Sequence, residues 1–283
     1  MRVIYENSRG TQADFSRGVI RAVKIGGTSA YAVINSSESA FFYGADSVSS
    51  SLGARRITVT LAVCSKDTEC ISALNSIAET EEKGRLIFIT EDSTKETACY
   101  LEKMTVDQDS DPVKITMTFV CPSPFFESAS SHMESGALLC GTRGMLEFDW
   151  ELKEDGMILS DFTDEDSASV VNNGTFSSGC IITVHVLRQT ESIRIGNADT
   201  GEYIELDGVW NSGSTIKIDT RHGSKGVECT ENGVDYTDVI SRLKWGSAFF
   251  SLIPGVNRIY VRTSGGAECL SAYISFRERY EGI

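Results

Sequence analysis

Apolar and polar residues alternate in short runs between residues 172 and 223, and turn-forming residues separate the runs. A period of two places the apolar residues of each run on one face of a β-strand. Asn, Asp and Gly residues stand between the runs, where they favour tight turns. The stretch therefore predicts a meander of half-buried antiparallel strands, which is a scaffold rather than a site of chemistry. The alternating apolar positions are Ile182, Val184 and Val186; Ile193 and Ile195; Ile204 and Leu206; and Ile216 and Ile218.

One segment has a different period. From Lys66 to Glu82, apolar residues recur at steps of three and four, which places them on one face of an α-helix. Asp67 or Thr68 is suited to cap its start, and the pair Lys83-Gly84 is suited to end it. This is the one amphipathic helix that the sequence predicts. Its apolar face consists of Cys70, Ile71, Leu74, Ile77 and Ala78.

Short apolar or alternating runs predict strands in the rest of the chain. Residues 44–53 are rich in Ser and predict a loop, and the polar residues 91–94 predict a hairpin turn. In the first half, the predicted strands are 3–5, 19–25, 30–34, 40–43, 55–64, 85–90, 97–104 and 113–121. In the second half they are the meander, short strands near 138 and 227, and residues 145–150, 157–159, 239–243, 259–262 and 270–276.

The sequence also indicates where one domain ends and the next begins. Pro122 and Pro124 are two of only four prolines, and the Ser-rich residues 127–136 follow them. Proline interrupts strand pairing, and such a segment is typical of a linker. We therefore expect a mainly β domain with one helix at 1–126 and an all-β domain at 127–283. Strands repeated about every 8–12 residues favour a β-sandwich for the second domain.

The charge of the chain narrows its possible partners. The net charge is −14, with 13 Lys/Arg against 17 Asp/Glu in residues 1–130 and 13 against 23 in residues 131–283. A sequence-specific nucleic-acid binder needs a basic surface, so this balance argues against one. No run of about 18 apolar residues is present to span a membrane. The first residues also lack the apolar core of a signal peptide, so we expect synthesis in the cytoplasm.

No group of residues has the spacing of a catalytic or metal site. The histidines, His132, His185 and His222, have no His or Cys partner at ligand spacing. Asp107, Asp109 and Asp111 resemble the start of a calcium loop, but the sixth and twelfth positions hold proline and threonine in place of glycine and glutamate. We therefore expect no catalytic residue, no cofactor and no metal. The eight cysteines form no Cys-x-x-Cys pair and are expected to be small buried hydrophobes: Cys64, Cys70, Cys99, Cys121, Cys140, Cys180, Cys229 and Cys269.

Two tryptophans keep a different function open. Trp210 and Trp245 could stack on sugar rings, with Arg194 and Arg221 nearby, in a lectin-like β-sandwich that binds host-surface glycans. A tryptophan in such a fold more often fills the edge of the core or an interface. Glycan hydrolysis would need a paired set of carboxylates, for which the spacing gives no sign.

With these residues laid out, the chain resembles the distal tail proteins of long-tailed phages, the siphovirus-type tail component family. No single motif is specific, but the order and spacing of several motifs along most of the chain carry the resemblance. They are Tyr5-Glu6-Asn7-Ser8-Arg9-Gly10; Arg56-Ile57-Thr58-Val59, followed by the helix at 67–82; the strand 113–121, closing on Pro124-Phe125-Phe126; the meander from Asn173-Gly174 to Ile218-Asp219-Thr220; and Phe249-Phe250-x-Leu252-x-Pro254-Gly255-x-Asn257.

The resemblance implies a non-enzymatic structural protein of a virion, or of a tail derived from a prophage. It implies a tail-tube-like β-sandwich or split barrel with one flanking helix at 1–126, and a galectin-like β-sandwich, pointing outward, at 127–283. Six copies would form a ring that joins the tail tube to the tail tip or baseplate and lets DNA pass. The implied location is the tail tip of the virion, after synthesis in the host bacterial cytoplasm.

The resemblance also implies a set of partners. These are further copies of the chain, the tail tube protein, the tail-tip or tail-associated protein, the tape measure protein and, in some phages, receptor-binding proteins, with no membrane. The sequence has no room for the carbohydrate-binding module that some family members insert. We expect helix 67–82 and hairpin 85–104 to contribute to subunit contacts and to the channel wall. The basic segment from Arg2 to Lys24 is expected to meet an acidic surface of a neighbouring copy.

Overall fold

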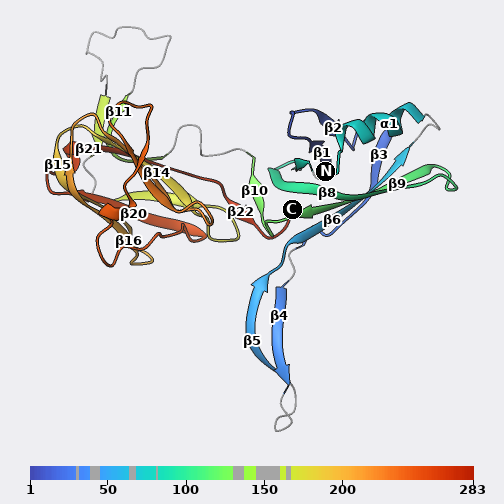
Figure 1. Ribbon diagram of the computed structural model, residues 1–283, viewed down its shortest axis with the longest axis horizontal. Helices are drawn as coiled ribbons and strands as arrows, with labels where there is room; N and C mark the ends of the chain where they lie inside the picture. Colours follow the sequence, from blue (N-terminus) through green and yellow to red (C-terminus); the bar gives the residue numbers. More distant parts are fainter. Residues whose placement is uncertain are drawn as a thin grey trace, which may run out of the picture. The chain divides into compact units, whose positions relative to one another are not determined.

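The computed structural model describes residues 1–29, 32–38, 45–63, 68–80, 82–129, 137–144, 160–163 and 167–283. The chain forms two compact units, unit 1 (residues 1–129 and 279–283) and unit 2 (residues 130–278) (Figure 1). The sequence-based division lay at residue 126 and placed everything after it in the second domain. The structure returns residues 279–283 to unit 1, because a strand there pairs with the strand at 126–128.

Unit 1 is built on one antiparallel sheet. Its strands are β1 (Arg2–Glu6), β2 (Gln12–Asp14), β3 (Ile20–Gly26), β6 (Arg55–Val63), β7 (Lys83–Ile89), β8 (Thr94–Asp107), β9 (Val113–Cys121), β10 (Phe126–Ser128) and β22 (Arg279–Tyr280). In the described residues their order is β2-β1-β7-β8-β9-β6-β3, and β10 pairs with β8 and β22. The predicted alternation of β9 matches its burial, since Ile115, Met117 and Phe119 are fully buried.

The two edges of this sheet approach each other near Phe15. The backbone N–H of Ala22 in β3 donates to the carbonyl oxygen of Phe15, which directly follows β2, at 2.6 Å. Helix α1 (Thr68–Ile77) flanks the same region and buries Leu74 in the core of unit 1. A barrel-like sheet with one flanking helix is the fold class that the sequence predicted for the first half.

Helix α1 is shorter than the predicted segment 66–82. The N–H of Ala78 still donates to the carbonyl of Leu74 at 2.9 Å, as in a helix. Thr80, however, already forms a parallel bridge with Leu101 of β8. Pairing with a strand requires extended backbone, so the helix ends before the predicted limit.

Strands β4 (Ala32–Glu38) and β5 (Ala45–Leu52) form a separate two-stranded hairpin (Figure 1). The prediction of a Ser-rich loop at 44–53 is wrong, because these residues pair in antiparallel register with β4, starting from Ala32 opposite Leu52. Serine is common in loops, yet main-chain pairing with a partner strand can order it. The strand predicted at 40–43 lies outside the described residues.

Arg55, at the start of β6, is a buried cation with 1% of its surface exposed. Its guanidinium donates to the carbonyl oxygens of Thr28 and Glu281, both at 2.6 Å, and also to that of Pro124. Its Cζ lies 4.3 Å from the centroid of the Phe126 ring. Burial lowers the pKa of Arg55. The side chain therefore holds three segments of unit 1 together through their backbones.

Unit 2 is a sandwich of two antiparallel sheets. The first contains β11 (Ala137–Gly144), β12 (Ser160–Thr163), β14 (Cys180–Val186), β17 (Thr215–Asp219), β18 (Gly226–Thr230), β19 (Thr237–Asp238) and β21 (Leu270–Phe276). The second contains β13 (Ala168–Asn172), β15 (Thr190–Asn197), β16 (Tyr203–Trp210) and β20 (Gly255–Thr263). The orders in the described residues are β12-β11-β21-β14-β17-β18-β19 and β13-β20-β15-β16. Both sheets contribute to one apolar core, which confirms the predicted sandwich. The strands of the predicted meander form, but they do not pair in chain order, because β14 and β17 pair in the first sheet and β15 and β16 pair in the second.

Of three strands predicted for the second half, one is wrong and two lie outside the described residues. Residues 239–243 were predicted as a strand, but they contain the 3₁₀ helix η1 (Ile240–Arg242), and only Leu243 forms a bridge, with Leu206. A short apolar run fits one helical turn as well as a strand. The strands predicted at 145–150 and 157–159 lie outside the described residues. A second 3₁₀ helix, η2 (Ala267–Cys269), precedes β21.

Candidate assembly interface

The β4–β5 hairpin exposes apolar side chains on both of its faces. Val33 and Ile34 are consecutive, so they point to opposite faces of β4, and they are 39% and 63% exposed. A two-stranded hairpin by itself is at best marginally stable in water. Covering either face with another surface would bury one of these side chains and stabilise the hairpin. The hairpin is therefore a candidate contact with another chain.

Strand β3 offers a second candidate surface at the edge of the main sheet. The side chains of Arg21, Val23 and Lys24 are exposed, Val23 to 64%. In the described part of the chain, neither Arg21 nor Lys24 has an ion-pair partner. An edge strand also carries main-chain groups that another strand can pair with.

An apolar pocket of about 290 Å³ lies beside this edge, between helix α1 and residues 13–20. Phe15, Leu74 and Ile77 are among its lining residues. Phe15 and Leu74 are buried and Ile77 is partly exposed, so the apolar lining makes this pocket a third candidate contact, adjacent to β3.

Part of the basic segment predicted to meet a neighbouring copy is used within the chain instead. Arg2 donates from Nε to Oδ2 of Asp14 at 2.8 Å. Arg9 lies 3.6 Å from Glu79 and 3.8 Å from Glu82. These pairs are partly exposed and contribute little to stability. The basic residues left for an external partner are those of β3 and Arg17, which is also exposed.

The two histidines in the described part of the chain belong to no cluster of metal-ligating side chains. His185 lies on the exposed face of β14, with Nδ1 3.0 Å from Oγ1 of Thr215, and its ring meets Tyr273 edge-on. His222 is exposed in the turn after β17, and His132 lies outside the described residues. Among the residues that the structure describes, no three His, Cys, Asp or Glu side chains gather closely enough to hold a metal ion. No described helix is long and apolar enough to cross a lipid bilayer.

The aspartates at 107–111 shape the turn between β8 and β9. Oδ1 of Asp107 accepts the N–H of Asp109 at 3.2 Å, and Oγ of Ser110 donates to the carbonyl of Pro112 at 3.0 Å. The side chains of Asp107, Asp109 and Asp111 are all exposed. This arrangement is a polar turn stabilised by its own hydrogen bonds.

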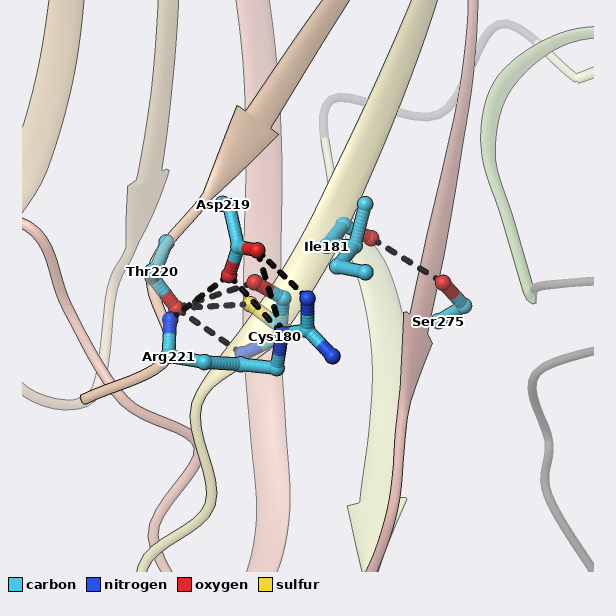
Figure 2. Close-up of polar contacts among 6 residues, drawn as sticks. All are labelled: Cys180, Ile181, Asp219, Thr220, Arg221 and Ser275. Carbon is cyan, nitrogen blue, oxygen red and sulfur yellow. Dashed lines mark hydrogen bonds and ion pairs between the residues drawn. The ribbon is translucent and has the colours of Figure 1, made fainter. Parts of the chain in front are cut away.

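Six cysteines have described side chains, and all six are free and buried, as expected. Burial raises the pKa of Cys180 to about 12 and those of Cys121 and Cys140 to about 11. Because the thiolate is the reactive form, these thiols are poor nucleophiles at neutral pH. Sγ of Cys180 lies 3.4 Å from Oγ1 of Thr220, and the same hydroxyl oxygen accepts the backbone N–H of Cys180 at 2.8 Å (Figure 2). The side chains of Cys64 and Cys70 lie outside the description.

The two candidate sugar-stacking tryptophans have opposite environments. Trp210 is 2% exposed and belongs to the core of unit 2, so its rings cannot form a surface platform. Trp245 is 99% exposed. It stands in a turn closed by a hydrogen bond from the N–H of Ser247 to the carbonyl of Lys244 at 3.1 Å.

The arginines considered with them are already paired. Arg221 donates from Nε to Oδ1 of Asp219 at 3.0 Å and from Nη2 to Oδ2 at 2.6 Å (Figure 2). Burial raises the pKa of Asp219, but the hydrogen bonds from Arg221 outweigh it and leave that pKa below its usual value. Arg194 stacks 3.7 Å from the Tyr203 ring and lies 3.8 Å from Glu205. The predicted combination of Trp210 or Trp245 with these two arginines does not form a sugar site.

Two buried asparagines explain motifs on which the resemblance rested. Nδ2 of Asn257 donates to the carbonyls of Ile253 at 2.8 Å and Gly255 at 3.1 Å, while its Oδ1 accepts from Nδ2 of Asn197 at 2.9 Å. Nδ2 of Asn172 donates to the carbonyl of Leu252 at 2.9 Å. These side chains fix the loop before β20 against strands β13 and β15, so the motifs are structural.

Comparison with protein families decides the identity of the fold. Residues 15–121 match the phage tail protein RIFT-related domain, and residues 173–280 match the siphovirus-type tail component, C-terminal domain. The two matches fall in chain order, one in each unit. The chain belongs to the siphovirus-type tail component family. No curated protein sequence matches the chain.

Solved structures of tail components share the fold of this family member. One is the crystal structure of the Dit protein of phage SPP1, described as a paradigm of the hub adsorption apparatus in phages that infect Gram-positive bacteria. It has 15% sequence identity and a TM-score of 0.67 over 98% of each chain. Another is a chain of the phage P2 baseplate in its activated conformation with Ca, at 9% identity and a TM-score of 0.50, with 100% of this chain and 99% of that chain covered.

The chain is thus a structural component of the distal tail of a siphophage, in a family of structural proteins rather than enzymes. Sequence reasoning found the family and most strands. The strand predicted at 30–34 overlaps β4, but β5, its pairing with β4 and the strand β22 were missed. The two residues of β22 gave no local sign at all.

Proposed function

We propose that six copies of the chain form a ring with a central channel, which joins the tail tube to the tail tip or baseplate. The observation that carries this proposal is the β4–β5 hairpin, which pairs only with itself among the described residues and exposes Val33 and Ile34. Such a hairpin needs a covering surface, and a neighbouring copy in a ring supplies one at every position.

A closed ring requires two different complementary surfaces on each copy. Unit 1 offers the hairpin as one surface. The edge of β3, with Arg21 and Lys24, and the apolar pocket beside helix α1 together offer another. We propose that the β4–β5 hairpin of one copy contacts the β3 edge and the apolar pocket of the next copy. Helix α1 and the hairpin β7–β8 would then contribute to the subunit contact and the channel wall.

The proposed channel passes DNA without binding it. A net charge of −14 disfavours contact with phosphates, and acidic walls repel a polyanion. The chain would therefore make no sequence-specific contact with nucleic acid.

The proposed partners follow from the two units. Unit 1, residues 1–129 with 279–283, would act as the tail-tube-like part and contact the tail tube protein, the tail-tip protein and the tape measure protein. Unit 2 would be the galectin-like part that points outward, and in some phages it would carry receptor-binding proteins. The SPP1 Dit protein described as a hub of the adsorption apparatus supports this placement at the tail tip.

Negative-stain electron microscopy of the purified chain tests the ring. The proposal expects six-fold rings with a central hole. The proposal is contradicted if the sample contains no rings at high protein concentration, but instead compact single particles or filaments that do not close.

A further inference from the structure

A second pocket, of about 450 Å³, opens in unit 2 beside the end of β16, η1 and the turn between β18 and β19. Its buried lining residues include Trp210 and Ser214, each with 2% of its surface exposed, and Cys229, with 8%. A volume of this size falls in the range of small-molecule sites, roughly 300–1,000 Å³. The pocket is lined by residues of unit 2, whereas the candidate contacts are in unit 1, and no step of the ring proposal uses it.

The polar lining of this pocket combines hydrogen-bond acceptors with donors. Glu231 and Asp235 bring carboxylates, which accept. Arg242 brings a guanidinium and Asn211 an amide N–H₂ group, both of which donate. A pyranose sugar presents adjacent hydroxyl groups that each donate and accept, so this lining matches its chemistry.

The walls of the pocket are held in place without a ligand. Arg242 stacks over the Trp210 ring, with Cζ 4.5 Å from its centroid, and donates to the carbonyl of Val209 at 3.2 Å. Asn232 fixes the opposite turn, since Nδ2 donates to Oδ2 of Asp235 at 2.9 Å. Oδ1 of Asn232 also accepts the N–H of Asp235 at 2.9 Å. Groups fixed in this way lose little freedom when a ligand binds.

Nε1 of Trp210 is buried and has no acceptor within hydrogen-bonding distance in the described part of the chain. Because this atom has almost no accessible surface, a ligand in the pocket would contact the carboxylates and the guanidinium around it rather than the indole N–H.

We propose that this pocket binds a neutral or amino pyranose, with the carboxylates of Glu231 and Asp235 and the guanidinium of Arg242 holding its hydroxyl groups. The two carboxylates outnumber the one guanidinium, which disfavours an acidic sugar. The pocket would give the distal tail component a weak glycan contact in addition to its structural role. It differs from the sugar site considered for the sequence, because the contacts come from Glu231, Asp235 and Arg242 rather than from Arg194, Arg221 and a stacking face of Trp210.

The test uses the full chain with ¹⁵N-labelled tryptophan and follows the indole N–H signals by NMR. Trp150→Phe and Trp245→Phe variants assign the signal of Trp210. Glucose, galactose, glucosamine and N-acetylglucosamine are titrated separately, with glucuronic acid as the acidic sugar. The proposal expects at least one neutral or amino sugar to shift the Trp210 signal saturably, and glucuronic acid to bind more weakly.

The variants Glu231→Gln and Asp235→Asn separate this pocket from nonspecific binding. Each change is expected to weaken binding about tenfold, as for loss of a charge-assisted hydrogen bond. Glu202→Gln, an exposed glutamate elsewhere in unit 2, is the matched control and should leave binding unchanged. The proposal is overturned if no sugar shifts the Trp210 signal up to its solubility limit. It is also overturned if the double variant Glu231→Gln/Asp235→Asn binds as tightly as the original chain.

Discussion

The guanidinium of Arg55 donates a hydrogen bond to the backbone carbonyl of Glu281 at 2.6 Å, and the two residues lie 226 positions apart in the sequence. Around this contact, β22 pairs with β10, so that Phe126 stands opposite Tyr280. Nζ of Lys95 adds a hydrogen bond to the carbonyl of Gly282 at 3.1 Å. Residues 279–283 are therefore a structural part of unit 1, although unit 2 separates them from it along the chain.

Replacing Arg55 by methionine is expected to destabilise unit 1 by about 3 kcal/mol. The change leaves the carbonyls of Thr28, Pro124 and Glu281 without their donor, and each unpaired buried group costs about 1–3 kcal/mol, partly offset by the apolar side chain. Urea denaturation followed separately for the two units measures the effect.

Arg56→Met is the matched control for this prediction. Arg56 is the next residue, but its side chain is 65% exposed and its ion pair with Glu102, at 3.2 Å, is on the surface. Its loss should change stability by less than about 1 kcal/mol. Equal effects of the two variants would show that Arg55 is not the link described here.

Deleting residues 279–283 should destabilise unit 1 by a similar amount and should not add fully to Arg55→Met. Both changes remove the same hydrogen bond to Glu281, so their effects share one interaction. A double-mutant cycle measures this coupling. Fully additive effects would mean that the tail and Arg55 stabilise unit 1 independently.

The contacts of Arg55 illustrate what the sequence could and could not predict. Strict alternation of apolar and polar residues predicted β9 and β14, because alternate side chains of a strand point to the same face and the apolar face is buried. Strand β22 depends on pairing with β10, which no local pattern encodes. The Ser-rich strand β5 was read as a loop because its order comes from β4.

The prediction of candidate sites from the sequence is limited in the same way, because sites also depend on contacts between distant segments. Sequence reasoning named Trp210 and Trp245, but which of them is buried depends on how β16 packs in the sandwich. It also chose Arg194 and Arg221, whereas the arginine that meets Trp210 is Arg242. Proximity along the chain was a poor guide, because the pocket is assembled from β16, β18 and η1.

Asn257→Asp should destabilise unit 2 by about 3 kcal/mol at neutral pH. Nδ2 of Asn257 donates to the carbonyls of Ile253 and Gly255, and a carboxylate there would place negative charge against both oxygens. Thermal unfolding across a pH series measures the effect.

The loss of stability caused by Asn257→Asp should depend on pH in one direction. Burial against carbonyls should raise the pKa of the new carboxyl group above its unfolded value. The penalty is then largest at a pH above the folded pKa and shrinks as the pH falls, because the protonated group can donate. Gln189→Glu, an exposed change in unit 2, should show neither the loss nor this trend. A pH-independent loss at Asn257 would contradict the assignment.

The buried thiols should resist modification until the chain unfolds. Burial raises the pKa of Cys180 to about 12 and that of Cys140 to about 11, so almost no thiolate exists at pH 8. Maleimide labelling with and without urea, read residue by residue by mass spectrometry, tests this. Fast labelling of Cys180 in the folded chain would show that β14 opens or packs differently.

The measurement that tests the ring most directly is the mass of the chain in solution, compared with that of the variant Val33→Ser/Ile34→Ser. Analytical ultracentrifugation should give six copies for the original chain and a smaller species for the variant, because the exposed side chains of the hairpin contribute to the subunit contact. Val256→Ser, which changes a valine of unit 2 that is 57% exposed, should remain a hexamer. A monomer for the original chain at every concentration, or a hexamer that the hairpin variant leaves intact, would contradict the account.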